Sequence, residues 1–142
     1  SISPYIDVSQ KNKLSQNKQA GARKKPERVE GTLSCELPKT LVKKNDIHIT
    51  SKRNFDCFQD TELDMLLKRT LNIKNIIICG VNTDTCVYGT TFGASNRGYN
   101  PIVIECCTGS MRGEDQHKTA LKIMSQSIAW VMKKEEIINK LN

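Results

Sequence analysis

The feature that most constrains this chain is an apolar run that leads directly into a helix start carrying a cysteine. Residues 76–79 are apolar, β-branched for the most part and of strand length, which is typical of a parallel strand covered on both faces. Gly80 is expected to end the strand, and Thr83 or Asp84 to cap the following helix through its first amides. Cys86 then falls in the first helical turn, where the helix dipole favours a thiolate over a thiol. The pattern predicts an active-site turn, although a free cysteine at a random position is more often a packed core residue.

The charge of the chain is concentrated at one end. Its 142 residues suit one domain, and residues 1–30 carry seven Lys or Arg against three acidic residues, which is +4 of the net charge of +7. Few apolar residues occur in this stretch, so we expect a basic lead segment, a loop or disordered, followed by a domain over residues 31–142. A nucleic-acid-binding arm is the alternative, but the segment lacks interleaved aromatic residues, so no nucleic-acid partner is expected.

The six cysteines do not suggest a disulfide framework or a metal site. Nothing resembles a signal peptide, no C-x-x-C pair occurs, and His48 and His117 stand alone. A reduced, cytoplasmic protein without a metal or a cofactor is therefore expected. The longest apolar stretches are far shorter than the ~20 residues that span a bilayer, so no membrane partner is expected either.

The rest of the chain alternates strand and helix patterns. Strands are expected at 47–50, 76–79, 101–105 and 128–132, and helices at about 61–71, 84–97, 116–126 and 134–141. This order predicts an α/β fold, a three-layer αβα arrangement in which a parallel sheet has helices on both faces.

Three helices carry informative side-chain patterns. Leucines 63, 66, 67 and 71 form an apolar stripe that should pack on a sheet, and small residues 89, 90, 93 and 94 should allow a neighbour to approach the second helix closely. His117 lies on an apolar face of the third helix and is expected to be packed rather than to act as a base. Ligands of such sheets bind where the carboxyl ends of the strands open, and Lys52, Cys86 and the loop after Glu105 all fall at that edge.

Two motifs resemble a known family. The stretch Gly80-Val81-Asn82-Thr83-Asp84-Thr85-Cys86-Val87 is similar to the G-V-x-T-x-x-C-V nucleophile turn of the isochorismatase-like cysteine hydrolases, which include N-carbamoylsarcosine amidases, ureidoacrylate amidohydrolases and nicotinamidases. Residues 49–53, with Phe58 and residues 61–64 after them, are similar to the lysine motif of that family. Weaker signposts follow in the same order, so the resemblance runs from Gly31 to about Leu141.

The resemblance implies a site and a reaction. It makes Cys86 the nucleophile and Lys52 the second member of a triad, with an oxyanion hole from the amides of Asn82 and Cys86 and a cis peptide bond between Val81 and Asn82. The expected function is cysteine-dependent hydrolysis of a small carboxamide, carbamoyl or ureido compound through an acyl-enzyme. A homo-oligomer is expected as the working form. The loops contain no sequence pattern that identifies the particular substrate.

The chain also departs from the family pattern. The family's third catalytic residue is an Asp at the end of an N-terminal strand, and residues 1–30 show no such strand; Asp7 is only a faint echo of it. Glu105 stands where the family usually has Asp, and the metal-binding Asp-x-His pattern of nicotinamidases is missing. We therefore expect a fold that is incomplete at the N-terminus. The alternative function is a non-catalytic or truncated relative with a binding or assembly role.

Overall fold

The computed structural model describes residue 33 and residues 36–141. The chain falls into two compact units. The first unit holds the described residues up to Asn54 together with Gln59–Glu62, and the second unit holds Phe55–Phe58 and the described residues from Leu63 onward. The basic segment 1–30 lies outside the described residues, so its separation from the domain stays a prediction.

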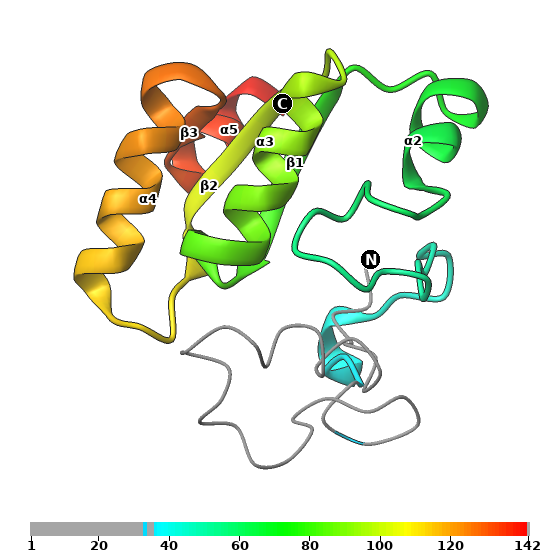
Figure 1. Cartoon of the computed structure of the whole chain (residues 1–142), viewed down its shortest axis with the longest axis horizontal. Coiled ribbons are helices and arrows are strands. Elements are labelled where there is room, and N and C mark those ends of the chain that lie inside the picture. Colours follow the sequence, from blue (N-terminus) through cyan, green and yellow to red (C-terminus); the bar gives the residue numbers. More distant parts are fainter. Residues whose placement is uncertain (1–32, 34–35, 142) are drawn as a thin grey trace, which may run out of the picture. The chain divides into compact units, whose positions relative to one another are not determined.

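The second unit is built on a three-stranded parallel sheet (Figure 1). Its strands are β1 (Asn75–Val81), β2 (Asn100–Gly109) and β3 (Trp130–Met132), in the order β1-β2-β3. They correspond to the strands expected at 76–79, 101–105 and 128–132, and both neighbouring pairs are parallel. The predicted α/β fold with a parallel sheet is confirmed.

Helices pack against both faces of the central strand of this sheet. α3 (Tyr88–Asn96) links β1 to β2, α4 (Glu114–Ser127) links β2 to β3, and α5 (Lys134–Leu141) follows β3. Neighbouring residues of a strand point to opposite faces, and Val103 and Ile104 of β2 are both buried, with 0% and 3% of their surface exposed. The central strand is therefore covered from both sides, by contacts with α3, α4 and α5.

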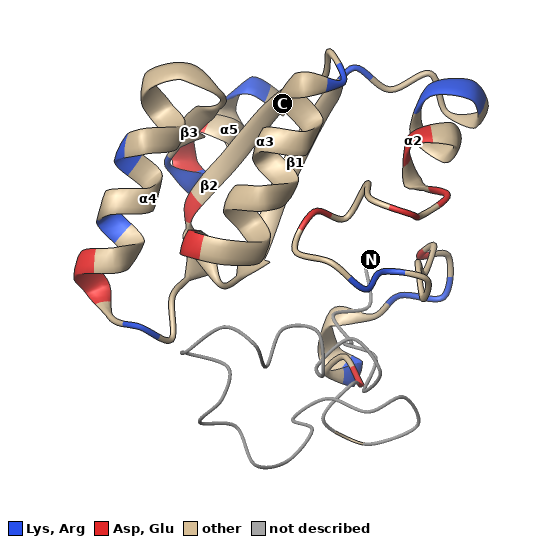
Figure 2. Cartoon of the chain, viewed as in Figure 1, with Lys and Arg blue, Asp and Glu red and all other residues tan. Residues whose placement is uncertain are grey.

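α4 shows the pattern that the sequence predicted. Its first turn carries Glu114 and Asp115, whose charges complement the positive end of the helix dipole (Figure 2). Its buried residues are spaced by three and four positions and so lie on one face of the helix. These residues are His117, Ala120, Leu121 and Met124.

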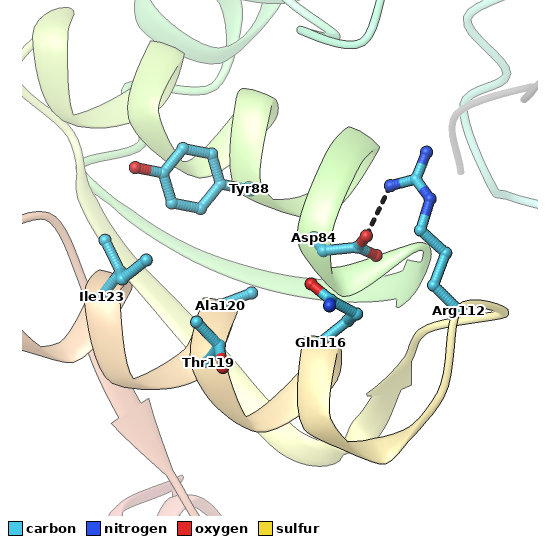
Figure 3. A pocket seen from close by; sticks show the side chains of 7 residues that line it. All are labelled: Asp84, Tyr88, Arg112, Gln116, Thr119, Ala120 and Ile123. Carbon is cyan, nitrogen blue, oxygen red and sulfur yellow. Dashed lines mark hydrogen bonds and ion pairs between the residues drawn. The ribbon is translucent and has the colours of Figure 1, made fainter. Parts of the chain in front are cut away.

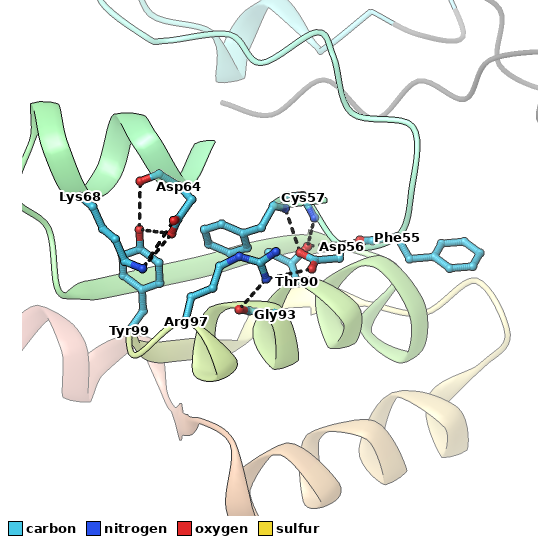
Figure 4. Close-up of polar contacts among 10 residues, drawn as sticks. Phe55, Asp56, Cys57, Asp64, Lys68, Thr90, Gly93, Arg97 and Tyr99 are labelled. Atoms are coloured by element: carbon cyan, nitrogen blue, oxygen red, sulfur yellow. Dashed lines mark hydrogen bonds and ion pairs between the residues drawn. The ribbon is translucent and has the colours of Figure 1, made fainter. Parts of the chain in front are cut away.

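α3 has a side of small residues, and a turn segment packs closely against it (Figure 4). A Cβ atom added at Gly93 would lie 2.4–2.6 Å from atoms of the Asp56 carboxylate, and one added at Gly89 would lie 3.4 Å from Phe55. The close approach expected for this side of the helix is confirmed. The neighbour is the segment Phe55–Phe58, rather than a sheet or a helix.

Asp56 is held in place by several donors. Its Oδ2 atom accepts a bond from Arg97 at 3.3 Å, and its Oδ1 atom accepts one from the amide of Phe58 at 2.8 Å. The same guanidinium donates to the carbonyl of Gly93 at 3.0 Å and lies 5.0 Å from the centre of the Phe58 ring. These bonds fix the carboxylate against α3.

Tyr99 joins the start of β2 to the short helix α2 (Leu63–Met65). Its hydroxyl donates to Asp64 at 2.8 Å (Figure 4). Burial, and then the bond to the Asp64 carboxylate, raise the pKa of Tyr99 to about 12. Burial alone would raise the pKa of Asp64 too, but the bonds from Tyr99 and Lys68 outweigh it and lower that pKa.

One face of β1 is open, which corrects the expectation that this strand is covered on both sides. Ile77 and Val81 are 46% and 54% exposed, while Ile78 is buried. Ile77 pairs with Ile102, which is half-buried, and Ile102 pairs with Trp130, which is 69% exposed, so this row of apolar residues crosses the sheet and is open at both ends. An apolar run shows that a strand forms, but it does not show how many layers cover it.

Three further expectations are corrected. β1 does not end at Gly80 but runs on to Val81. Residues 47–50 do not form a strand, and only Ile49 among them is a bridge residue. The leucine stripe lies on α2, on a π-helical turn, Leu66–Thr70, and on the residue after that turn, and only Leu63 of its four residues is buried.

Candidate active site

The turn between β1 and α3 departs from an ordinary α-helix start. Thr83–Val87 forms a π-helical turn, and the carbonyl of Asn82 accepts hydrogen bonds from the amides of Thr85 and Val87, both at 3.1 Å. In an α-helical turn this carbonyl would accept the amide four residues on, which belongs to Cys86. Neither of the two observed bonds involves the amide of Cys86. Single π-helical turns are rare in proteins overall, but those that occur are often found at functional sites.

Thr83 and Asp84 do not cap this helix, contrary to the expectation. The N-cap position belongs to Asn82, whose side chain makes no capping bond. The hydroxyl oxygen of Thr83 instead lies 2.8 Å from the Nδ1 atom of His117 on α4, and both residues are buried. His117 is thus packed, as the sequence predicted, and it ties the turn to α4.

Asp84 is bound from the loop after β2. Its carboxylate accepts a hydrogen bond from Ser110 at 2.7 Å and forms an ion pair with Arg112 (Figure 3). Burial alone would raise the pKa of Asp84, but the bonds from these two donors outweigh it and hold the pKa below its ordinary value. The carboxylate therefore stays charged and braces the turn.

The loop after β2 supplies a second brace. The amide of Met111 donates to the Oδ1 atom of Asn82 at 3.0 Å. Val81 pairs with Gly109, so the two strands end side by side and bring this loop to the turn. The sequence placed the loop at this edge but did not single out the side chains of Asn82, Ser110 or Arg112. Their position directly after a strand end is the signal that could have identified them.

A groove of about 320 Å³ lies between the turn, α3 and α4 (Figure 3). The Asp84–Arg112 pair forms one end of it, and Tyr88 and Ile123 lie toward the other. Cys86 is not among its lining residues, so this groove is not the place where the expected nucleophile would meet a substrate. The lining residues are Asp84, Tyr88, Arg112, Gln116, Thr119, Ala120 and Ile123.

The predicted site residues lie in both units. Cys86 is a half-buried free thiol in the π-helical turn, and the peptide bond between Val81 and Asn82 is cis. Lys52 belongs to the first unit and is only 5% exposed. The catalytic roles of Cys86 and Lys52, and that of the backbone amides, stay predictions.

Neither a metal site nor a membrane segment is visible within the described residues. Over residue 33 and residues 36–141, no group of three or more His, Cys, Asp and Glu side chains is arranged to hold a metal ion. In the same part of the chain, every helix is too short or too polar to reach across a bilayer.

Solved structures of known proteins share this fold. An isochorismatase-like hydrolase from Alkaliphilus metalliredigens is 27% identical and superimposes with a TM-score of 0.75. The matched region is 80% of this chain and 61% of the hydrolase chain. A nicotinamidase from Staphylococcus aureus is 32% identical, covers 74% of this chain and 69% of its own, and has a TM-score of 0.66. An isochorismatase family protein from Desulfovibrio vulgaris, at 18% identity and a TM-score of 0.81, shows the likeness of fold alone and covers 99% of this chain and 73% of its own.

Sequence comparison points to the same family. An isochorismatase family protein of Escherichia coli O157:H7 is 33% identical over 97 residues, which is 68% of this chain and 50% of that protein. One from Bacillus subtilis is 28% identical over 105 residues, 74% of this chain and 54% of that protein. The chain thus spans about half the length of these two curated relatives. The profile of the isochorismatase domain matches residues 5–136, and the chain therefore belongs to the isochorismatase family.

Proposed function

We propose that the protein is a cysteine-dependent hydrolase that cleaves the C–N bond of a small carboxamide, carbamoyl or ureido compound. The thiolate of Cys86 attacks the carbonyl carbon, and the amides of Asn82 and Cys86 stabilise the negative oxygen of the tetrahedral intermediate. The C–N bond then breaks, and the amine or ammonia leaves with a proton. Water attacks the remaining thioester, or the thiocarbamate that a carbamoyl or ureido compound leaves, and so releases the carboxylic or carbamic acid and restores the thiol.

The backbone of the turn is the observation that carries this proposal. The carbonyl of Asn82 accepts the amides of Thr85 and Val87 and not that of Cys86. An oxyanion hole needs amides that are not already engaged and that are held rigidly. The bonds from Met111 to Asn82, and between Thr83 and His117, provide the rigidity.

The burial of Lys52 supports its role as the second member of the site. A lysine is almost never fully buried unless it has a partner, and an exposed, solvated position is the ordinary one. Lys52 is only 5% exposed. We propose that Lys52 acts with Cys86 as the second member of the site, and that an acidic side chain, with Asp7 the first candidate, accepts the thiol proton. Asp7 lies outside the described residues.

Family likeness supports the substrate class. The nicotinamidase from Staphylococcus aureus, at 32% identity, is named for an amide substrate, as is a nicotinamidase from Bacillus subtilis that is 28% identical with a TM-score of 0.58. We therefore include carboxamides among the substrates of this chain. The alternative function, a non-catalytic relative that binds or assembles, is favoured by the absence of an identifiable acid in the sequence.

Substitution of the nucleophile tests the proposal. The chain and its Cys86→Ala variant are assayed for ammonia release on a panel of small carboxamides, carbamoyl compounds and ureido compounds. The variant should lose about 10³-fold or more of the activity, because covalent catalysis is removed. Cys106→Ser replaces an exposed thiol on β2 and should leave the activity of the reduced protein unchanged.

Thiol labelling provides a readout that does not require turnover. Limited alkylation of the reduced protein at neutral pH, followed by peptide mapping, should label Cys86 before the other five cysteines. If no compound of the panel is hydrolysed and Cys57 or Cys107 is labelled before Cys86, the hydrolase proposal is wrong and the non-catalytic alternative is favoured.

We further propose that copies of the chain associate through the open face of the sheet and that the protein is cytoplasmic. The row Ile77, Ile102 and Trp130 crosses all three strands, and large exposed aromatic residues often anchor interfaces. Trp130→Ser should shift the chain toward the monomer in sedimentation experiments, whereas Met111→Ser, at an even more exposed residue outside the sheet face, should not. The five described cysteines are all free thiols, which suits a reducing compartment.

A further inference from the structure

A group of three thiols lies outside the proposed site, at the middle of the β1–β2 pair. Cys79 belongs to β1, and Cys106 and Cys107 belong to β2; all three residues are exposed. The Sγ atoms of Cys106 and Cys107 are 4.0 Å apart. The thiol of Cys79, on the neighbouring strand, lies close enough to interact with that of Cys107. Cys107 therefore has one neighbouring thiol on its own strand and one on β1.

An irregularity in strand pairing brings these thiols together. Ile78 pairs with Val103, and the pairing resumes with Gly80 opposite Thr108. One residue of β1, which is Cys79, thus stands opposite four residues of β2. In a regular strand, adjacent side chains point to opposite faces, so the contact between the thiols of Cys106 and Cys107 shows that β2 is bulged at this point.

We propose that Cys79 and Cys107 form an oxidisable thiol pair, a modification site at which a peroxide closes a disulfide between β1 and β2. In the first step a Cys thiol of the pair takes one oxygen atom from hydrogen peroxide, which gives a sulfenic acid and one water. In the second step the other thiol attacks the sulfenic sulfur, the S–S bond forms, and a second water leaves. The two thiols lose two electrons in total, and the peroxide gains them.

Chain geometry favours this pair over the two sequence neighbours. A disulfide ordinarily joins Cα atoms that are about 4.4–6.8 Å apart. Adjacent strands are spaced about 4.7–4.9 Å apart, which lies within that range. Adjacent residues are only about 3.8 Å apart across a trans peptide, which lies below it. This argument excludes a bond between Cys106 and Cys107. Of these two residues of β2, Cys107 is the one whose thiol interacts more closely with that of Cys79.

The electrostatics predict how the pair responds to pH. Burial, and then the neighbouring thiols of Cys107 and Cys106, raise the pKa of Cys79 to about 11. Burial also raises the pKa of Cys107. Peroxide reacts with the thiolate and not with the thiol, so oxidation of the pair should be slow at neutral pH and should accelerate as the pH rises toward 10.

The location of the pair connects it to the proposed site. The disulfide would join the strands one residue before Gly80 and Thr108, whose pairing leads into the turn and the loop. Ser110 and Arg112 of that loop hold Asp84, and the amide of Met111 holds Asn82. Oxidation should therefore alter the surroundings of Cys86. This coupling rests on the proposed function, whereas the formation of the disulfide does not.

Peptide mapping tests the proposal on the full chain. The reduced protein is treated with hydrogen peroxide at pH 7 and pH 9, free thiols are blocked, and the chain is digested after Lys and Arg and before Asp. Cleavage before Asp84 separates Cys79 from Cys86. We expect a linked pair of peptides that contain Cys79 and Cys107, two hydrogens lighter than the separate peptides, and more of it at pH 9.

Single substitutions identify the linked residues. Cys79→Ser and Cys107→Ser should each abolish the linked peptides, whereas the matched variant Cys106→Ser should retain them. The three variants replace exposed residues, and circular dichroism checks that each one folds. The proposal is overturned if Cys106→Ser removes the link, if the link joins Cys106 to Cys107, or if Cys107 gains two or three oxygen atoms without any link. None of these outcomes depends on whether the chain hydrolyses an amide.

Discussion

The hydroxyl oxygen of Thr83 and the Nδ1 atom of His117 lie 2.8 Å apart in a buried contact that fastens the turn after β1 to α4. Among the described residues, no buried side-chain nitrogen or oxygen lacks a partner. The contact is therefore part of a fully satisfied interior, and its loss should be measurable.

Replacement of Thr83 by Val should destabilise the protein. Val has nearly the shape of Thr but no hydroxyl, so the buried Nδ1 atom of His117 would lose its partner. The expected cost is about 1–3 kcal/mol in the free energy of unfolding, measured by urea denaturation. Thr119→Val on the exposed side of α4 is the matched control and should change that free energy by less than about 0.5 kcal/mol. Equal effects of the two substitutions would contradict the prediction.

Asp84 should stabilise the protein in a way that depends on pH. Its pKa is lowered in the folded state, so the folded chain binds the proton less readily than the unfolded chain does. The stabilisation is fully present above the ordinary pKa of 3.8 and is lost as the pH falls through the lower folded value. The difference in unfolding free energy between the wild type and Asp84→Asn should therefore be constant near neutral pH and shrink below about pH 4. If the difference in unfolding free energy stayed the same between pH 7 and pH 2, the prediction for Asp84 would be wrong.

Two glycines of α3 should respond differently to the same substitution. Gly93→Ala places a methyl group against the Asp56 carboxylate, which Arg97 and the Phe58 amide hold in place, and should cost about 1–3 kcal/mol. Gly89→Ala makes only an ordinary contact with Phe55 and gains helix propensity, so it should be neutral or stabilise the chain by up to about 1 kcal/mol. Thermal unfolding of both variants checks this, and the reverse order would show that Asp56 can move aside.

Tyr99 should ionise at a higher pH than an ordinary tyrosine does, and it should stabilise the fold at pH values below its pKa. Its pKa is raised from 10 to about 12, so its contribution is fully present below pH 10 and is lost as the pH rises through the folded value. Absorbance titration of the wild type and of Tyr99→Phe should assign the transition near pH 12 to this residue. Asp64→Asn removes the carboxylate that accepts the hydroxyl, and it should move the transition toward lower pH. A transition of Tyr99 near pH 10 in the wild type would refute the predicted bond.

The sequence by itself was enough to predict the elements whose pattern is local. Apolar runs predicted β1, β2 and β3, and the spacing of His117, Ala120, Leu121 and Met124 predicted the buried face of α4. The small residues of α3 predicted a close neighbour. These features depend on side-chain periodicity and size, which the chain carries at each position whatever surrounds it. The family's nucleophile motif likewise placed Cys86 at a strand-to-helix turn, where the structure has it.

The tertiary structure decided what each polar group binds. Thr83 and Asp84 have the side chains of helix caps, but His117 on α4 and Ser110 after β2 provide better partners, and the turn becomes π-helical. The pairing shift that gathers Cys79 and Cys107 depends on two strands far apart in sequence. The open face at Ile77 reflects which layers are present, not the composition of the strand. Such outcomes follow from competition among distant partners, and a local pattern contains no information about the partner that wins.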